Sequence, residues 1–224
     1  RTGCEDSKFG FTMKNDFAFN CVGDVLAAEN VRLLGFHCHI GSQIFALTSF
    51  REAVQVMTEF VLRVKEKYGF VTKELDMGGG LGIAYTADDR PSSIDEFAEC
   101  TVSAVRDFCA HYQLKEPRIM VEPGRSLVAN AGVTLYTVGI LKTLPGIRKY
   151  IAVDGGMSDN IRTALYHAQY EPTIANKAGQ MRTEIVTLCG KHCESGDAVV
   201  VDMPLQKAEL GDIVCVFATG AYCY

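Results

Sequence analysis

Apolar residues follow two different patterns along this chain, and the patterns meet near Asn130. Between residues 31 and 125, short apolar runs alternate with long amphipathic segments, which is typical of βα units around a parallel sheet. After residue 131, short β-branched runs are separated by glycines, which favours a mostly antiparallel β domain. We therefore predict two domains, residues 1–130 and residues 131–224.

The first region is predicted to hold three strands separated by two helices. Apolar residues recur at helical spacing from Phe50 to Val64, Gly69 provides a stop, and Ser49 with Glu52 forms a candidate capping box. The predicted strands are Leu33–Cys38, Glu74–Met77 and Ile119–Val121, and the predicted helices are Ser49–Tyr68 and Ile94–Tyr112.

The second region is predicted to be built from strands with a turn at Thr143–Gly146. The predicted strands are Val133–Val138, Tyr150–Val153, Glu184–Leu188, Ala198–Val201 and Ile213–Phe217. The chain begins at Arg1 rather than Met and stops directly after a motif, so we expect it to be a piece of a longer protein.

Composition limits the classes of function. The 224 residues are 48% hydrophobic and 22% charged, as in a globular protein with a buried core. A net charge of −5 without any Lys/Arg run argues against a nucleic-acid partner. No signal peptide or bilayer-length apolar stretch is visible, so we expect no membrane partner and a cytoplasmic location. The nine cysteines never form Cys-x-x-Cys pairs, so we expect no metal site.

The first two predicted strands end in motifs suited to a phosphate and a planar ring. The glycines of Gly78–Gly82 leave backbone amides accessible to a phosphate, although a tight turn without a ligand is the alternative. Ser42 offers a hydroxyl for the same phosphate. His39 is interpreted as an imidazole that stacks on a cofactor ring, and His37 as a core histidine bonded to backbone.

The third predicted strand ends in Glu122-Pro-Gly-Arg125. Pro123 and Gly124 are expected to turn the chain sharply, so that both charged side chains are presented rather than absorbed into a helix. A carboxylate at a pyridine nitrogen keeps that nitrogen protonated, and an arginine can grip a phosphate or carboxylate with two hydrogen bonds. The alternative is a turn that carries a surface ion pair.

Cys193 differs from the other cysteines because it stands in a polar, turn-prone stretch with His192, Glu194 and Asp197. Cys109, by contrast, falls on the apolar face of a predicted helix. A thiol can donate a proton near neutral pH, so Cys193 is the candidate catalytic acid.

In their order and in their residues, these motifs resemble those of the fold-type III pyridoxal-phosphate decarboxylases, most closely the diaminopimelate decarboxylases. The resemblance extends from Lys8 to Tyr222. The motifs that carry it are His39–Gln43, Gly78–Gly82, Glu122–Arg125, Cys193–Asp197 and Gly220–Tyr222.

The resemblance implies an α/β fold, a (β/α)8 TIM-like barrel of which only the later strands are present, followed by a mostly antiparallel β domain. It implies pyridoxal 5'-phosphate as cofactor and a homodimer with shared active sites. The implied cofactor-binding residues are His39, Ser42, Gly78, Gly79, Gly80, Glu122, Gly124, Arg125 and Tyr222. The implied substrate-binding residues are Arg125, Arg162, Tyr166, Glu194 and Tyr222, with Cys193 as proton donor.

The implied reaction is decarboxylation of meso-2,6-diaminopimelate to L-lysine and CO2, the last step of lysine biosynthesis. Arg162 and Glu194 suit the amino-acid group at the far end of that substrate, whereas decarboxylases of the ornithine type bind a bare amine and typically carry Asp in place of Glu194. Two alternatives stay open, a decarboxylase of another basic amino acid and a catalytically dead homologue that acts as a binding or regulatory module. No lysine of this sequence stands where the family places its Schiff-base lysine.

Overall fold

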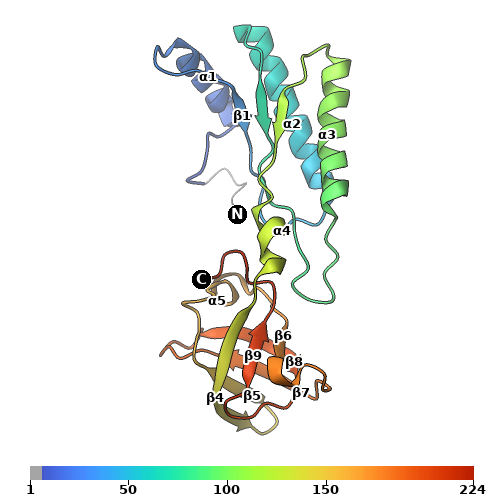
Figure 1. Cartoon of the computed structure of the whole chain (residues 1–224). Coiled ribbons are helices and arrows are strands. Elements are labelled where there is room, and N and C mark those ends of the chain that lie inside the picture. The colour runs from blue at the N-terminus through green and yellow to red at the C-terminus, as the bar shows by residue number, and fades with distance from the viewer. Residues whose placement is uncertain (1–6) are drawn as a thin grey trace. The chain divides into compact units, whose positions relative to one another are not determined.

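The computed structural model describes residues 7–224, which divide into two compact units (Figure 1). The first unit contains the described residues up to Ile83 together with Arg90–Ser126. The second contains Ala84–Asp89 and Leu127–Tyr224, so a short segment that follows the glycine-rich motif joins the later half of the chain. No helix in the described range has the length and apolar character needed to cross a membrane.

The first unit is a parallel sheet of three strands in the order β1-β2-β3, with helices on one face (Figure 1). Each β-to-β connection passes through a long helix, as a parallel sheet requires. The strands are β1 (Gly35–His37), β2 (Glu74–Asp76) and β3 (Arg118–Met120), and the helices are α1 (Phe17–Ala27), α2 (Leu47–Tyr68), α3 (Ile94–His111) and α4 (Gly124–Val128), with a 3-10 turn at Lys14–Asp16.

Strand register decides which residues face the helices. Phe36, Leu75 and Ile119 lie side by side in the ladder and pack against the core formed by α2 and α3. Because side chains alternate along a strand, the neighbouring row that contains His37 and Asp76 lies on the face without helices. This face is where the strand-end motifs gather.

The predicted βα pattern is confirmed, with strands slightly shorter than predicted, but the predicted capping box is wrong. Helix α2 begins at Leu47, two residues before Ser49, and its N-cap residue Ala46 has no side-chain cap. The apolar residues of the N-terminal turn determine this start, because Leu47 and Phe50 pack against Leu81 and Phe97. A capping box is present on α3, where Ser93 and Glu96 bond reciprocally.

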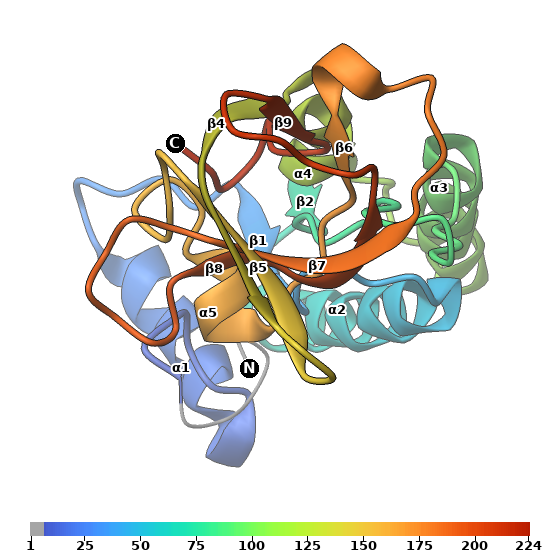
Figure 2. The ribbon, with the colours of Figure 1, turned by 90° about the horizontal axis from the view of Figure 1, so that it is seen from below.

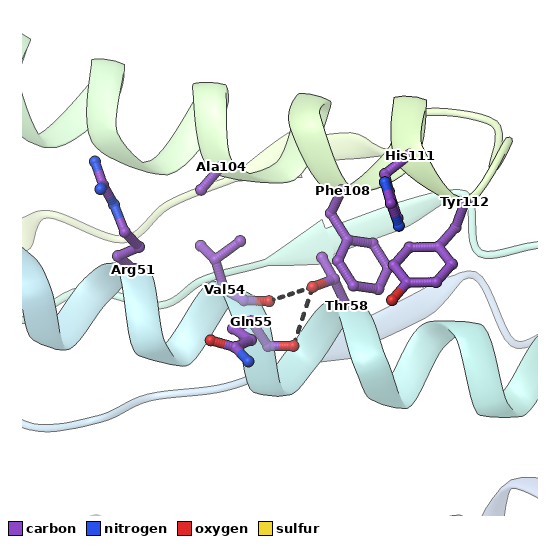
Figure 3. Close-up of a pocket in the computed structure, with 8 residues that line it drawn as sticks. All are labelled: Arg51, Val54, Gln55, Thr58, Ala104, Phe108, His111 and Tyr112. Carbon is purple, nitrogen blue, oxygen red and sulfur yellow. Dashed lines mark hydrogen bonds between the residues drawn. The ribbon is translucent and has the colours of Figure 1, made fainter.

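A shallow groove of about 260 Å3 lies on the outside of the first unit between α2 and α3 (Figure 3). Thr58 in its floor donates its hydroxyl to the Val54 and Gln55 carbonyls, and the rings of Phe108 and Tyr112 stack at one end. None of the predicted site residues lines it.

The second unit is a sheet of six strands in the order β6-β9-β4-β5-β7-β8. Four of its five pairings are antiparallel and the β5 to β7 pairing is parallel, so the predicted mostly antiparallel domain is confirmed. The strands are β4 (Thr134–Leu144), β5 (Arg148–Val153), β6 (Pro172–Ile174), β7 (Glu184–Cys189), β8 (Ala198–Leu205) and β9 (Ile213–Val216), with helix α5 (Arg162–Tyr166) and 3-10 turns at Ala129–Ala131 and Ala175–Lys177.

Strand β4 joins the two parts of this sheet. Its first half pairs with β9 and its second half forms a hairpin with β5 (Figure 2), closed by the predicted turn, in which Gly146 has a φ of +72°. Buried side chains from the strands and from Tyr170 fill the core. The predicted strands are all present, whereas β6 and the helices α1, α4 and α5 were not predicted.

Candidate functional site

The glycine-rich loop after β2 is pressed between the loops that follow β1 and β3. A Cβ on Gly78 would lie 2.3 Å from the Cys38 carbonyl oxygen, and one on Gly79 would lie 2.1 Å from the Glu122 carbonyl oxygen. Gly80 has a φ of +107°, which side chains disfavour. The glycines are therefore required by close backbone packing as well as suited to a ligand.

Backbone amides of this loop are candidate donors to an anion. The Gly78 amide donates to the Asp76 side chain at 2.9 Å, which fixes the first residue of the loop. Gly79 is buried, and its amide donates to no acceptor within residues 7–224. A buried amide without a partner is rare in proteins and indicates a place where a ligand acceptor would bind.

Arg125 lies beside Ser42, and its setting differs from the prediction. Arg125 belongs to α4 and is only 5% exposed, and its guanidinium donates to the Ser42 hydroxyl at 2.7 Å. The expectation that both charges stay outside a helix is wrong for Arg125, because Pro123 precedes a helical turn that Gly124 begins.

Gln43 is a site residue that our sequence analysis missed. Its side-chain amide donates to the Ile83 carbonyl at 2.7 Å and its carbonyl accepts from the Ile83 amide at 3.2 Å. Gln43 itself has a φ of +59°, which costs energy for a residue with a side chain. These two hydrogen bonds, which we call the Gln43 clamp, connect the loop after β1 to the residue that follows the glycine loop. In the sequence, the only signal for Gln43 was its position directly after Ser42.

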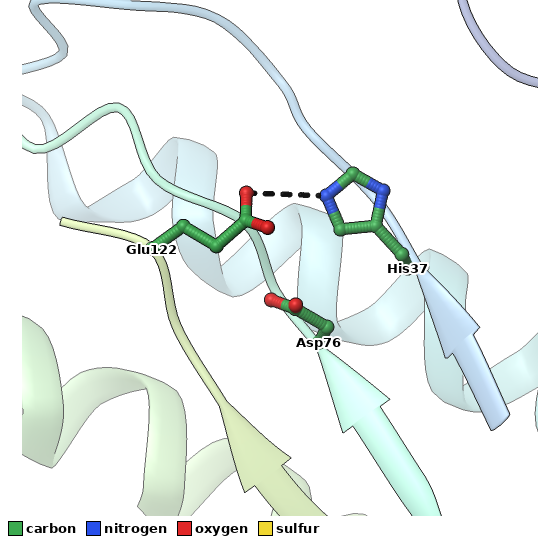
Figure 4. Close-up of side chains that lie close together, drawn as sticks. All are labelled: His37, Asp76 and Glu122. Carbon is green, nitrogen blue, oxygen red and sulfur yellow. Dashed lines mark hydrogen bonds and ion pairs between the residues drawn. The ribbon is translucent and has the colours of Figure 1, made fainter. Parts of the chain in front are cut away.

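His37, Asp76 and Glu122 form a polar cluster at the carboxyl ends of the three strands (Figure 4). His37 Nε2 lies 3.4 Å from Glu122 Oε2, and one ligand atom from each residue lies within 4.8 Å of the others. The interpretation of His37 as a core histidine is wrong, because strand register places it on the face without helices. The cluster offers donors that suit a cation, although Asp76 already accepts the Gly78 amide.

Glu122 and His39 both remain accessible in the first unit. The Glu122 side chain is 56% exposed, so its carboxylate can reach a ligand while it bonds to His37. His39 is also exposed and lies just beyond the end of β1, where its Cα packs against the glycine loop. The neighbouring Cys38 thiol is a poor acid, because burial and the charge of Asp76 raise its pKa to about 11.

In the second unit, the structure brings Arg162, Tyr166 and Tyr222 together. The guanidinium carbon of Arg162 lies 5.4 Å from the centre of the Tyr166 ring and 5.2 Å from that of Tyr222. Such cation–π contacts orient the guanidinium while its hydrogen-bond donors stay available. Arg162 Nε is buried and has no hydrogen-bond partner in the described part of the chain.

Cys193 and Glu194 stand on an exposed loop between β7 and β8. Glu194 Oε1 accepts from the Ser195 hydroxyl and the Gly196 amide at 3.2 Å each, which leaves its other oxygen for a ligand. Cys193 is the exposed thiol among the cysteines that the structure describes, whereas Cys109 is buried on α3, as the sequence predicts.

Residues 1–129 match the family described as pyridoxal-dependent decarboxylase, pyridoxal binding domain. Over its whole length the chain is 48% identical to the diaminopimelate decarboxylase of Bacillus subtilis and 45% identical to that of Halalkalibacterium halodurans, and it covers 51% of each relative. The chain thus spans about half the length of the curated relatives it matches.

Solved structures show the same relationship. A diaminopimelate decarboxylase from M. jannaschii in complex with L-lysine matches 99% of this chain with a TM-score of 0.89 and 33% identity, over 50% of its own length. The Helicobacter pylori enzyme, also with L-lysine, matches 99% of this chain with a TM-score of 0.82 and 27% identity, over 52% of its own length. By family match, sequence identity and fold, this chain belongs to the pyridoxal-dependent decarboxylases.

Proposed function

We propose that this chain is part of an enzyme that uses pyridoxal phosphate to convert meso-2,6-diaminopimelate into L-lysine and CO2, the last step of lysine biosynthesis. The observation that carries the proposal is Arg162, whose buried Nε has no partner and whose guanidinium lies against two exposed tyrosines. An arginine in this state suits a substrate that carries a second carboxylate. Relatives that are 40–48% identical over the full chain are diaminopimelate decarboxylases, which supports the same substrate.

We assign residues 1–130 to the pyridoxal-binding barrel and residues 131–224 to the β domain that carries the substrate-binding and acidic residues. The end of the family match at residue 129 supports this boundary.

The residues of the first unit fit pyridoxal phosphate. The partnerless Gly79 amide and the side-chain-free loop suit a phosphate oxygen, and the Ser42 hydroxyl with its Arg125 donor suits another. We assign the phosphate to Ser42, Gly78, Gly79 and Gly80, with Gly124 and Arg125 nearby, the ring face to His39 and the pyridine nitrogen to Glu122. When bound, the cofactor withdraws electrons from the carbon that loses CO2.

The second unit would recognise and protonate the substrate. Arg162 would bind the distal carboxylate, Tyr166 and Tyr222 would hold the guanidinium in place, and Glu194 would bind the distal amino group. Tyr222 would also touch the cofactor. Cys193 would deliver the proton that replaces the lost carboxylate, a role that general acids perform with rate effects of about 10²- to 10⁴-fold.

A decarboxylase of another basic amino acid is the alternative that the sequence left open. A bare amine at the far end of such a substrate would leave the Arg162 guanidinium without an anionic partner and would place two positive charges together. Such a substrate would lack the charged hydrogen bond that a carboxylate accepts from the guanidinium, which is worth about 1.5–3 kcal/mol. This difference favours diaminopimelate over ornithine.

We further propose a homodimer in the cytoplasm in which the Cys193 loop of one subunit completes the cofactor site of the other, as the family resemblance implies. Glu122→Ala and Cys193→Ala disable different parts of the site, so mixed dimers of the two full-length variants would regain activity only if the site is shared. Failure of mixing to restore any activity would contradict the shared site.

The direct test is an assay of the full-length protein, loaded with pyridoxal phosphate, for release of lysine and CO2 from meso-diaminopimelate. Ornithine, arginine and lysine serve as competing substrates. Lysine release restricted to diaminopimelate supports the proposal. Cofactor binding without any product would favour the dead homologue instead.

The role of Cys193 has its own test. The Cys193→Ala variant should lose turnover by about 10²-fold or more while cofactor absorbance persists, because the thiol acts only in proton delivery. Cys215→Ala is a matched control, since Cys215 is buried in β9 away from the Cys193 loop. Unchanged turnover in Cys193→Ala would remove Cys193 from the reaction.

A further inference from the structure

Asp197, the last residue of the Cys193 motif, is buried, in contrast to the exposed Cys193 and Glu194. It is only 4% exposed, and each of its carboxylate oxygens accepts a backbone amide. Oδ1 accepts from the Met157 amide at 2.6 Å, and Oδ2 accepts from the His192 amide at 2.7 Å. The carboxylate therefore joins the loop before β8 to the loop that follows β5.

Two glycines make room for this carboxylate. A Cβ on Gly190 would lie 2.3 Å from Asp197 Oδ2, and one on Gly156 would lie 2.7 Å from Oδ1. Either contact is shorter than side chains tolerate, so the two loops close around Asp197 only because both positions lack a Cβ.

Other hydrogen bonds connect the same two loops, the one after β5 and the one before β8. The Lys191 amide donates to the Gly155 carbonyl at 2.9 Å, and the Ser158 hydroxyl lies 2.9 Å from His192 Nε2. The Asp197 amide closes the turn by donating to the Glu194 carbonyl at 3.0 Å. Cys193 and Glu194 thus project from a loop that is fixed on both sides of them.

We propose that Asp197 is a positioning residue that holds Cys193 and Glu194 in place for proton delivery and substrate binding. This inference rests on the proposed function of those two residues. Both carboxylate oxygens are occupied by amides, which excludes Asp197 as the proton carrier itself and leaves orientation as its contribution. A misplacement of about 1 Å can cost roughly 100-fold in rate, so a loop that carries an acid needs such an anchor.

The test is Asp197→Asn in the full-length protein with pyridoxal phosphate bound. Asn keeps the size of the side chain but turns one acceptor into a donor, which faces an N–H group. We expect turnover to fall by about 10- to 100-fold, with cofactor absorbance unchanged. Hydrogen exchange should quicken at residues 155–158 and 190–196 only, which a general loss of stability would not produce. Asp202→Asn is the matched control, because Asp202 pairs with Arg148 at the surface of the same sheet.

A double-mutant cycle separates this inference from the role of Cys193. If Asp197 acts through Cys193 and Glu194, Asp197→Asn should lower the kcat of a Cys193→Ala enzyme little or not at all, and the loss that comes through Glu194 should appear in KM. An equal loss in both backgrounds, or faster loop exchange with normal turnover, would overturn the positioning role. Unaltered turnover in Cys193→Ala alone would instead refute the proposed donor. If Asp197→Asn does not fold, Ser158→Ala removes the His192 contact, together with a long hydrogen bond to the neighbouring Asp159 at 3.4 Å, and enters the same cycle with a smaller expected loss.

Discussion

The glycines that we assign to the phosphate are enclosed by backbone, whereas most of the side chains that we assign to the substrate stand at the surface, on helix α5 and on the loop between β7 and β8. In the first unit, Gly78 and Gly79 touch the main chain that follows two neighbouring strands, so the ligand surface is also the packing surface. In the second unit, Cys193 and Tyr166 are exposed and their chemistry lies in side chains. Substitutions should therefore damage folding in the first unit and catalysis in the second.

The largest effect that this comparison predicts is that of Gly79→Ala. The added methyl group would lie 2.1 Å from the Glu122 carbonyl oxygen, which is part of the rigid main chain after β3. We expect a loss of about 1–3 kcal/mol in the free energy of unfolding together with loss of cofactor binding. Denaturant melts and cofactor absorbance measure the two losses.

Gly179→Ala provides the control for that substitution, because no atom lies within 4 Å of its Cβ position. Its stability should change little or rise by about 0.4–1 kcal/mol, as expected where the backbone accepts alanine. A Gly79→Ala protein as stable as the wild type would show that the first unit can shift its strand ends, and the contrast between the units would fail.

Arg162→Met is the corresponding test in the second unit. Loss of the guanidinium removes a charged hydrogen bond to the distal carboxylate, worth about 1.5–3 kcal/mol or roughly 10- to 100-fold in kcat/KM. Stability should stay nearly unchanged, because Tyr166 and Tyr222 contact Arg162 at the surface.

Assay with meso-diaminopimelate and thermal melting distinguish the two kinds of damage. Arg148→Met is a matched control, since Arg148 bonds Asp202 at the surface and has no assigned role. If Arg162→Met lowers stability as strongly as Gly79→Ala does, the exposed site of the second unit also serves the fold.

Gln43→Ala sharpens the comparison because Gln43 touches no assigned ligand atom. Removal of its two hydrogen bonds to Ile83 should cost about 1–2 kcal/mol and weaken cofactor binding through the glycine loop. Gln55→Ala is the control, since the side chain of Gln55 donates to Glu59 on the exposed side of α2. Cofactor titration of the two full-length variants is the measurement, and equal affinities would exclude a clamp function for Gln43.

The sequence predicted those elements of the fold that leave a regular pattern of apolar residues along the chain. Alternation of apolar runs predicted the three parallel strands and the β sheet. It did not predict β6, because a three-residue strand beginning at Pro172 has too short a pattern to stand out.

Errors arose where tertiary contacts overrode a local signal. Ser49 and Glu52 have the spacing of a capping box, but burial of Leu47 starts the helix earlier. His37 pairs with Glu122 from a strand 85 residues later in the chain, and that pairing depends on strand order, which no local spacing reveals.

The smallest expected effect is on the cap of α3. Ser93 donates its backbone amide and its hydroxyl to the Glu96 carboxylate, and these bonds lower the pKa of Glu96. A lowered folded-state pKa means that the charged carboxylate stabilises the fold above the unfolded pKa, and that this contribution disappears as the pH falls through the folded-state pKa.

Glu96→Gln should therefore be slightly less stable than the wild type at pH 7, and the two should converge in acid. Glu52→Gln, at the false capping box, is the matched control, because Ser49 lies within the first turn of α2 rather than at its cap. Thermal melts of the full-length proteins between neutral and acid pH measure both. Cofactor binding should be the same in the two variants, because a helix cap in the first unit affects its stability without touching the strand ends that form the site.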